Sequence, residues 1–131
     1  MRWVSLVLIL GLWGCKGCQH SQAHGTGDTD TDVIIDTVRA FPGEIEIVTL
    51  GPLTNLGQLL EAQPGLAGQI AEIIIMGGAV NVPGNVSISS DKNNRKAEWN
   101  LFADPYAAKI VLDSGAPITL IPLDATNKVP A

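Results

Sequence analysis

The residues best suited to chemistry follow directly after an apolar run in the middle of the chain. The run Ile73–Ile75 is typical of a buried strand, and Met76, Gly77 and Gly78 come next. Ligands in open parallel sheets bind at the carboxyl ends of strands. A pair of glycines there lets a ligand approach the backbone, because no Cβ stands in the way. We therefore expect a binding site at this strand end.

Amides and one carboxylate lie in the segment after the glycine pair. Asn81, Asn85, Glu98 and Asn100 offer donors and acceptors that suit a polyhydroxylated ligand with vicinal hydroxyls. The alternative is a polar loop in which Asn and Gly serve only turns. Met76 likewise has an alternative role, as a core methionine that fills a gap. On the residues alone, both interpretations stay open.

The elements that must position these side chains follow from the apolar pattern. It predicts an α/β fold with a mainly parallel sheet and flanking helices. The expected strands are 44–50, 73–76 and 118–123, and the expected helical segments are 33–40, 53–63, 66–71 and 104–114, with a long loop over 77–103.

The order of the expected strands and helices also predicts how the strands pair. Strands separated by helices pair in parallel through right-handed crossovers, so strands 73–76 and 118–123 should be neighbours, with helix 104–114 crossing between them. An exposed apolar edge or face should leave the chain marginally stable, oligomeric or prone to aggregation.

Length and charge limit the class of protein. The chain has 131 residues, enough for one domain with a core, and a formal net charge of −5. No basic patch is visible that would meet phosphates along a nucleic acid, so the sequence argues against a nucleic-acid partner.

Three motifs in this order resemble the inosine-uridine-preferring nucleoside hydrolase family, over about residues 33–129. The first is Leu-Gly-Pro-Leu-Thr-Asn-Leu at 50–56, and the second runs from Met-Gly-Gly through Gly-Asn and Ala-Glu-Trp-Asn to Asp-Pro at 76–105. The third is Gly-Ala-Pro-Ile-Thr-Leu-Ile-Pro-Leu-Asp-Ala-Thr at 115–126. The resemblance implies part of a nucleoside-hydrolase-like, Rossmann-like domain, and a chain that represents a central section of such a protein.

The resemblance also implies a function. The family is a calcium-dependent set of N-ribohydrolases that cut ribonucleosides into base and ribose, so the implied partner is a small-molecule nucleoside. By resemblance, Met76 packs against the ribose, and Asn85, Glu98 and Asn100 bind its hydroxyls. The backbone carbonyl of Leu50 corresponds to a calcium ligand, which does not depend on the side chain.

The family's metal-binding motif, Asp-x-Asp-x-x-x-Asp-Asp, has no clear counterpart. The Asp-Thr-Asp-Thr-Asp run at 28–32 follows no apolar strand and ends in no Asp-Asp pair. Calcium needs about six to eight oxygens, so we expect little or no hydrolysis of inosine or uridine by this chain and assign no catalytic residue. The alternatives are a non-catalytic exported module that binds ribose or nucleosides, and a decayed fragment. Asn81 and Asp124 have no certain family counterpart.

The N-terminus predicts export. Arg2 precedes an uncharged apolar run, Trp3–Trp13, that suits the core of a signal peptide. Gly14-Cys15 then resembles a bacterial lipobox, in which Cys15 is lipidated; a plain secretory signal or an uncleaved anchor is the alternative. We expect a signal at 1–15, a flexible polar tether at 16–32 and the nucleoside-hydrolase-like domain at 33–131. The expected location is outside the cytoplasm, either membrane-anchored through the lipid or periplasmic or extracellular.

Overall fold

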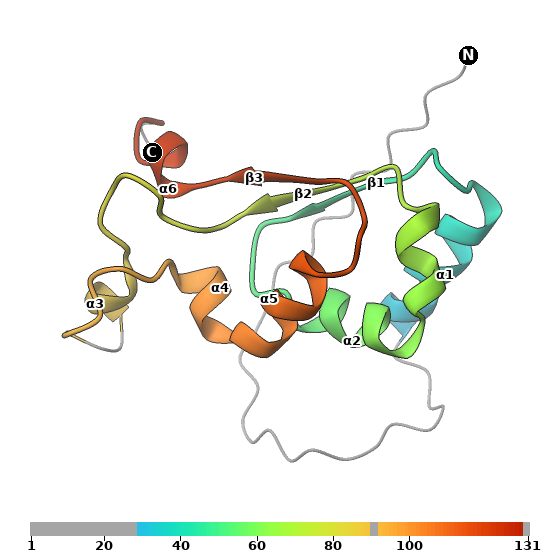
Figure 1. Ribbon diagram of the computed structural model, residues 1–131, viewed down its shortest axis with the longest axis horizontal. Coiled ribbons are helices and arrows are strands. Elements are labelled where there is room, and N and C mark those ends of the chain that lie inside the picture. Colours follow the sequence, from blue (N-terminus) through green and yellow to red (C-terminus); the bar gives the residue numbers. More distant parts are fainter. Residues whose placement is uncertain (1–28, 90–91, 130–131) are drawn as a thin grey trace.

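The structure, a computed structural model, describes residues 29–89 and 92–129. The signal segment and most of the expected tether, with Cys15, lie outside these residues. Figure 1 shows the arrangement of the elements, which are α1 (Thr29–Ala40), β1 (Glu46–Thr49), α2 (Thr54–Ala62), the 3₁₀ helix η1 (Pro64–Gln69), β2 (Glu72–Met76), α3 (Val86–Ser89), α4 (Trp99–Ala103), α5 (Pro105–Leu112), β3 (Ile118–Ile121) and α6 (Leu123–Thr126).

The three strands form one parallel sheet in the order β1-β2-β3. Ile47 pairs with Ile73, and Ile73 pairs with Ile118 on its other side. Helix α2 lies between β1 and β2 in the sequence, and α5 lies between β2 and β3. The predicted α/β fold is therefore confirmed, and so is the pairing of β2 with β3 around a crossing helix.

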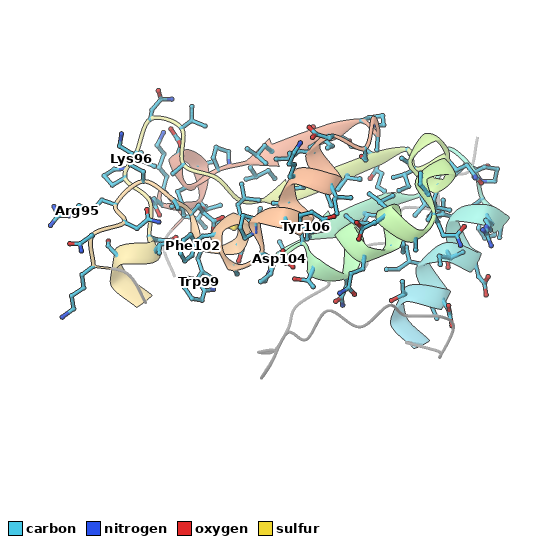
Figure 2. All side chains as sticks on the ribbon, turned by 60° about the horizontal axis from the view of Figure 1, so that its bottom comes forward. Arg95, Lys96, Trp99, Phe102, Asp104 and Tyr106 are labelled. Atoms are coloured by element: carbon cyan, nitrogen blue, oxygen red, sulfur yellow. The ribbon has the colours of Figure 1, made fainter. Side chains whose placement is uncertain are left out.

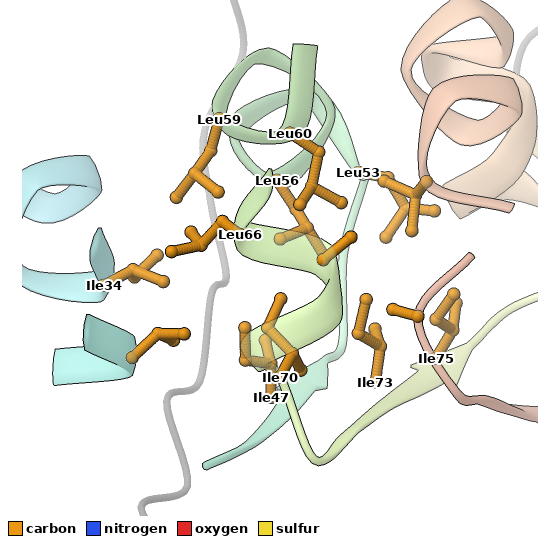
Figure 3. Packing of buried hydrophobic residues seen from close by; sticks show 14 of the residues in the cluster. Ile34, Ile47, Leu53, Leu56, Leu59, Leu60, Leu66, Ile70, Ile73 and Ile75 are labelled. Carbon is orange, nitrogen blue, oxygen red and sulfur yellow. The ribbon is translucent and has the colours of Figure 1, made fainter. Parts of the chain in front are cut away.

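The core lies between the sheet and the helices on one side of it (Figure 1). Alternate residues of β1 and β2 are buried, as expected for strands with one face against the core. Figure 3 shows Ile47, Ile73 and Ile75 of the sheet facing the leucines of α2, of which Leu56 and Leu59 are almost fully buried. Each such side chain contributes about 1.5–3 kcal/mol when it is removed from water.

Strand β3 is an exposed edge of the sheet. Leu120 and Ile121 keep 37% and 38% of their surface exposed, so the predicted exposed apolar edge is confirmed. An unpaired edge offers free backbone groups to another chain. Self-association of the chain stays a prediction. Within the described ranges, none of the helices is both long enough and apolar enough to cross a membrane.

Several predicted boundaries were wrong. Helix α1 begins at Thr29 instead of residue 33, so residues 29–32 of the expected tether are helical. The expected loop 77–103 contains α3 and α4. The third strand ends at Ile121, because Pro122 has no N–H for the ladder and a new helix starts at Leu123.

Helices α2 and α5 approach each other closely at Gly57. A Cβ at this position would lie 2.6 Å from the Cβ and 2.8 Å from the Cα of Ala107. Real side chains do not tolerate such distances, so the absence of a side chain at Gly57 allows α5 to cover the sheet at this depth.

Gly57→Ala should therefore destabilise the fold by about 1–2 kcal/mol, because overpacking costs more than the higher helix propensity of alanine returns. Urea denaturation measures the change. Gly68→Ala is the matched control, because no heavy atom lies within 4 Å of a Cβ placed there. Equal stability of the two variants would contradict the close packing of α2 and α5.

Candidate functional site

Asn100 joins the ends of two neighbouring strands. Its Nδ2 donates to the carbonyl of Met76 at 3.0 Å, contacts the Met76 sulfur at 3.2 Å and reaches the carbonyl of Leu50 at a longer 3.4 Å. The residue is only 8% exposed. Three residues that the sequence predicted for the site, Leu50, Met76 and Asn100, are thus brought together at the carboxyl edge of the sheet.

Glu98 is a buried carboxylate that accepts three backbone hydrogen bonds. It is 3% exposed, and its oxygens accept from the amides of Gly78 (3.1 Å), Asn100 (2.9 Å) and Leu101 (3.2 Å). Two of these bonds cap the N-terminus of α4, where a negative charge is favourable. The third holds the loop after β2. Glu98 therefore anchors the site, and its role as a ribose ligand stays a prediction.

The glycine pair after β2 packs closely against neighbouring side chains of the protein. A Cβ at Gly77 would lie 3.2 Å from Leu101 and 3.3 Å from the Glu98 carboxylate, so the space beside it is already filled by the protein. Gly78 has a φ of +86°, which favours glycine over any residue with a side chain. These glycines let the chain turn against α4, and the approach of a ligand at this strand end stays a prediction.

Asn85 joins the site at the N-terminus of α4. Its Oδ1 accepts from the amide of Trp99 at 2.7 Å, and the amides of Asn85 and Val86 both donate to the carbonyl of Ala97. Among the described residues, neither the Nδ2 of Asn85 nor the Oδ1 of Asn100 has a hydrogen-bond partner. One amide donor and one amide acceptor are thus free for a ligand.

Asp124 positions the loop beside the site, a role that the sequence had left open. At the start of α6 its two carboxylate oxygens accept from the amides of Val80 (2.9 Å) and Asn81 (2.8 Å). The amide of Leu123 also donates to the carbonyl of Gly78. The bond from Val80 is the main cause that lowers the pKa of Asp124, and bonds from Asn81 lower it further.

Sequence reasoning missed Thr49, the last residue of β1. Its side chain is 2% exposed, and its hydroxyl is the one buried side-chain polar atom in the described ranges that has no hydrogen-bond partner. Burying an unpaired hydroxyl is costly. The available signal was a threonine at the end of an apolar strand. The β-propensity of threonine already accounts for its presence in a strand, so the sequence gives no reason to expect a ligand contact there.

The described residues do not form a calcium site by themselves. Among them, no group of three or more His, Cys, Asp or Glu side chains is arranged to hold a metal. The carbonyl of Leu50, the predicted ligand, supplies one oxygen and already meets the amide of Asn100. Calcium takes about six to eight oxygens, so one carbonyl is not enough.

Comparison with known proteins decides the family. Residues 7–131 match the model of the family described as "Inosine-uridine preferring nucleoside hydrolase". The chain belongs to this family. It is 44% identical over 95 residues to the putative pyrimidine-specific ribonucleoside hydrolase RihB of Shigella boydii, a match that covers 72% of this chain and 36% of the relative. RihB of Escherichia coli K12 is 43% identical over 95 residues and is covered to 28%.

Solved structures agree with this assignment. The plant nucleoside hydrolase PpNRh1 superposes with a TM-score of 0.69 at 40% identity, over 87% of this chain and 34% of the plant protein. The inosine-uridine preferring nucleoside hydrolase from Bacillus anthracis gives a TM-score of 0.68 at 33% identity, over 77% of this chain and 33% of that protein. The chain thus spans about a third of the length of these family members.

Replacing the Glu98 carboxylate should loosen the site. In Glu98→Gln an NH₂ group faces backbone N–H donors, so at least one buried amide loses its partner, at a cost of about 2 kcal/mol. Thermal or urea unfolding measures this loss. Glu44→Gln is the control, because Glu44 is exposed and should change stability by less than about 0.5 kcal/mol. If both variants match the parent chain, Glu98 is not an anchor.

The two hydrogen bonds by which Asp124 anchors the amides of Val80 and Asn81 should depend on pH. Because its pKa is lowered in the folded chain, the anchor is fully present above the unfolded pKa of about 3.9 and is lost as the pH falls through the lower folded value. The NMR chemical shifts of the Val80 and Asn81 amides should change with pH along this titration. In Asp124→Asn, this pH-dependent change should disappear. Asp113→Asn, which removes a partner of Lys109, should leave it unchanged. A midpoint above 3.9 would contradict the assignment.

Proposed function

We propose that this chain carries the ribose-binding part of an N-ribohydrolase site, in which a ribonucleoside lies against the carboxyl ends of β1 and β2. The observation that carries the proposal is the side-chain amide of Asn100, which joins the carbonyls of Leu50 and Met76 and keeps its own oxygen free. Membership of the nucleoside hydrolase family supports the same reading.

The free groups suit vicinal hydroxyls. The Nδ2 of Asn85 offers a donor and the Oδ1 of Asn100 an acceptor, and a hydroxyl can meet either one because it both donates and accepts. Glu98 has used three of about four lone-pair positions on buried oxygens, so it has room for one more hydrogen bond. The Met76 side chain, beside Asn100, offers an apolar contact for the sugar ring.

Hydrolysis of the N-glycosidic bond to base and ribose is the activity that the family supports, with calcium as the metal that the resemblance implies. The described residues supply one carbonyl oxygen toward such a metal, so we assign no catalytic step to them. We propose that the 131-residue chain by itself hydrolyses nucleosides poorly.

A second candidate is a non-catalytic module that binds ribose or nucleosides. It is favoured by the way the ribose-side groups are held, because Asn85, Glu98 and Asn100 each make a hydrogen bond to a backbone group of the described residues. Export with lipidation at Cys15, and self-association through the exposed edge of β3, remain proposals from the sequence and the exposed strand.

Calorimetric titration of the chain with inosine and uridine tests the binding site. We expect saturable binding that survives a chelator. Asn100→Ala should weaken it about tenfold, the value of one hydrogen bond of about 1.4 kcal/mol. Asn127→Ala is the matched control, since Asn127 is exposed and lies beyond α6. Absence of binding, or equal losses in the two variants, would refute the proposed site.

A reducing-sugar assay with calcium tests the catalytic half in the same samples. We expect turnover far below the ordinary enzymatic range of about 1–1,000 s⁻¹. A rate within that range would show that the chain assembles a complete catalytic site. Binding that disappears with the chelator would count against the metal-independent module.

A further inference from the structure

An open hollow lies at the end of the molecule next to α3. Its volume is about 1060 Å³, and it is lined by the loop of residues 79–84, by Ser87 of α3, and by Lys92, Arg95 and Lys96. Figure 2 shows Arg95 and Lys96 at this end of the molecule, away from the helices that cover the sheet. A volume of this size accommodates a small organic ligand.

The charge in the hollow is opposite to that of the chain. Three of the eight basic residues lie within five positions here, although the net charge is −5. Among the described lining residues none is acidic, and the one ion pair in the described part of the chain joins Lys109 to Asp113 elsewhere. Asp91, which precedes Lys92 in the sequence, lies outside the described residues. The three cations of the hollow therefore have no carboxylate partner among the described residues.

Backbone hydrogen bonds hold the two walls of the hollow together. The amide of Gly84 donates to the carbonyl of Arg95 at 2.8 Å, and the amides of Lys96 and Ala97 donate to the Oδ1 of Asn94. A Cβ at Gly84 would lie 2.0 Å from the carbonyl oxygen of Ala97, so only glycine permits this approach. The backbone that carries Arg95 and Lys96 is thus fixed against the opposite wall.

The hollow is adjacent to the candidate ribose site. Gly84 lines the hollow, and the next residue, Asn85, accepts the hydrogen bond from the amide of Trp99 that brings it to the ribose-side residues. Consecutive Cα atoms are about 3.8 Å apart. The hollow and the candidate ribose site are thus neighbours along the chain, one residue apart at Gly84 and Asn85.

We propose that this hollow binds a phosphate group, and that together with the ribose site it takes a nucleoside monophosphate. Arg and Lys form strong charge-assisted hydrogen bonds to phosphate oxygens, and the hydroxyl of Ser87 adds a neutral donor. The sugar half of the ligand rests on the proposed function. The phosphate half rests on the cations and on the fixed walls of the hollow.

Calorimetry on the full chain tests this with four probes: inosine, inosine 5′-monophosphate, inosine 3′-monophosphate and inorganic phosphate. At least one monophosphate should bind about tenfold more tightly than inosine. In the double variant Arg95→Gln with Lys96→Gln, this advantage should fall to less than about threefold. It should persist in the charge-keeping variant Arg95→Lys with Lys96→Arg, and in the control Lys128→Gln, which removes an exposed cation outside the hollow.

The results separate the phosphate half of the proposal from the ribose half. Equal affinities for inosine and both monophosphates, or an equal loss in Lys128→Gln, would overturn the phosphate site. Inosine would then still report on the ribose site alone. A different outcome is that inosine fails to bind, while inorganic phosphate and the monophosphates bind equally and lose affinity in the Gln double variant. The phosphate site then stands with free phosphate as its ligand, and the proposed function fails. A thermal melt of each variant confirms that it is folded.

Discussion

The buried carboxylate of Glu98 is the interaction on which the rest of the site depends. It accepts from the amides of Gly78, Asn100 and Leu101, and so connects the end of β2 to the first turn of α4. A buried charge is tolerated only when it is satisfied by such bonds. The three amides satisfy it, and in return the carboxylate starts a helix of five residues that would be too short to be stable alone.

The other contacts of the site follow from this anchor. Because α4 begins at Trp99, the side chain of Asn100 reaches the ends of β1 and β2, and the Trp99 amide meets the Asn85 side chain. The loop after Gly78 is also held by Asp124, which accepts from the amides of Val80 and Asn81. The same backbone that presents the ribose-side amides continues into the basic hollow. The sugar and phosphate proposals therefore share one framework and can still be tested separately.

Local sequence signals predicted the sheet and helix α5. The features that were not predicted, such as the cap of α4, depend on contacts between residues far apart in the sequence. The strands stand out as short apolar runs, and Asp104 caps α5 as its position before Pro105 indicates, accepting from Ala107. Glutamate is not a usual N-cap, yet Glu98 caps α4, and its carboxylate also accepts from the amide of Gly78, twenty residues earlier. The predicted site residues came from family resemblance.

Hydrogen exchange of the Gly78 amide, followed by NMR, tests the central claim most directly. This amide lies in an irregular segment after a strand, where exchange is ordinarily fast. Its bond to the buried carboxylate of Glu98 predicts slow exchange, at a rate comparable to that of the Asn100 and Leu101 amides. In Glu98→Gln, exchange of all three amides should become faster together. Exchange of the Gly78 amide at the rate of an open loop, while the strands stay protected, would contradict the account.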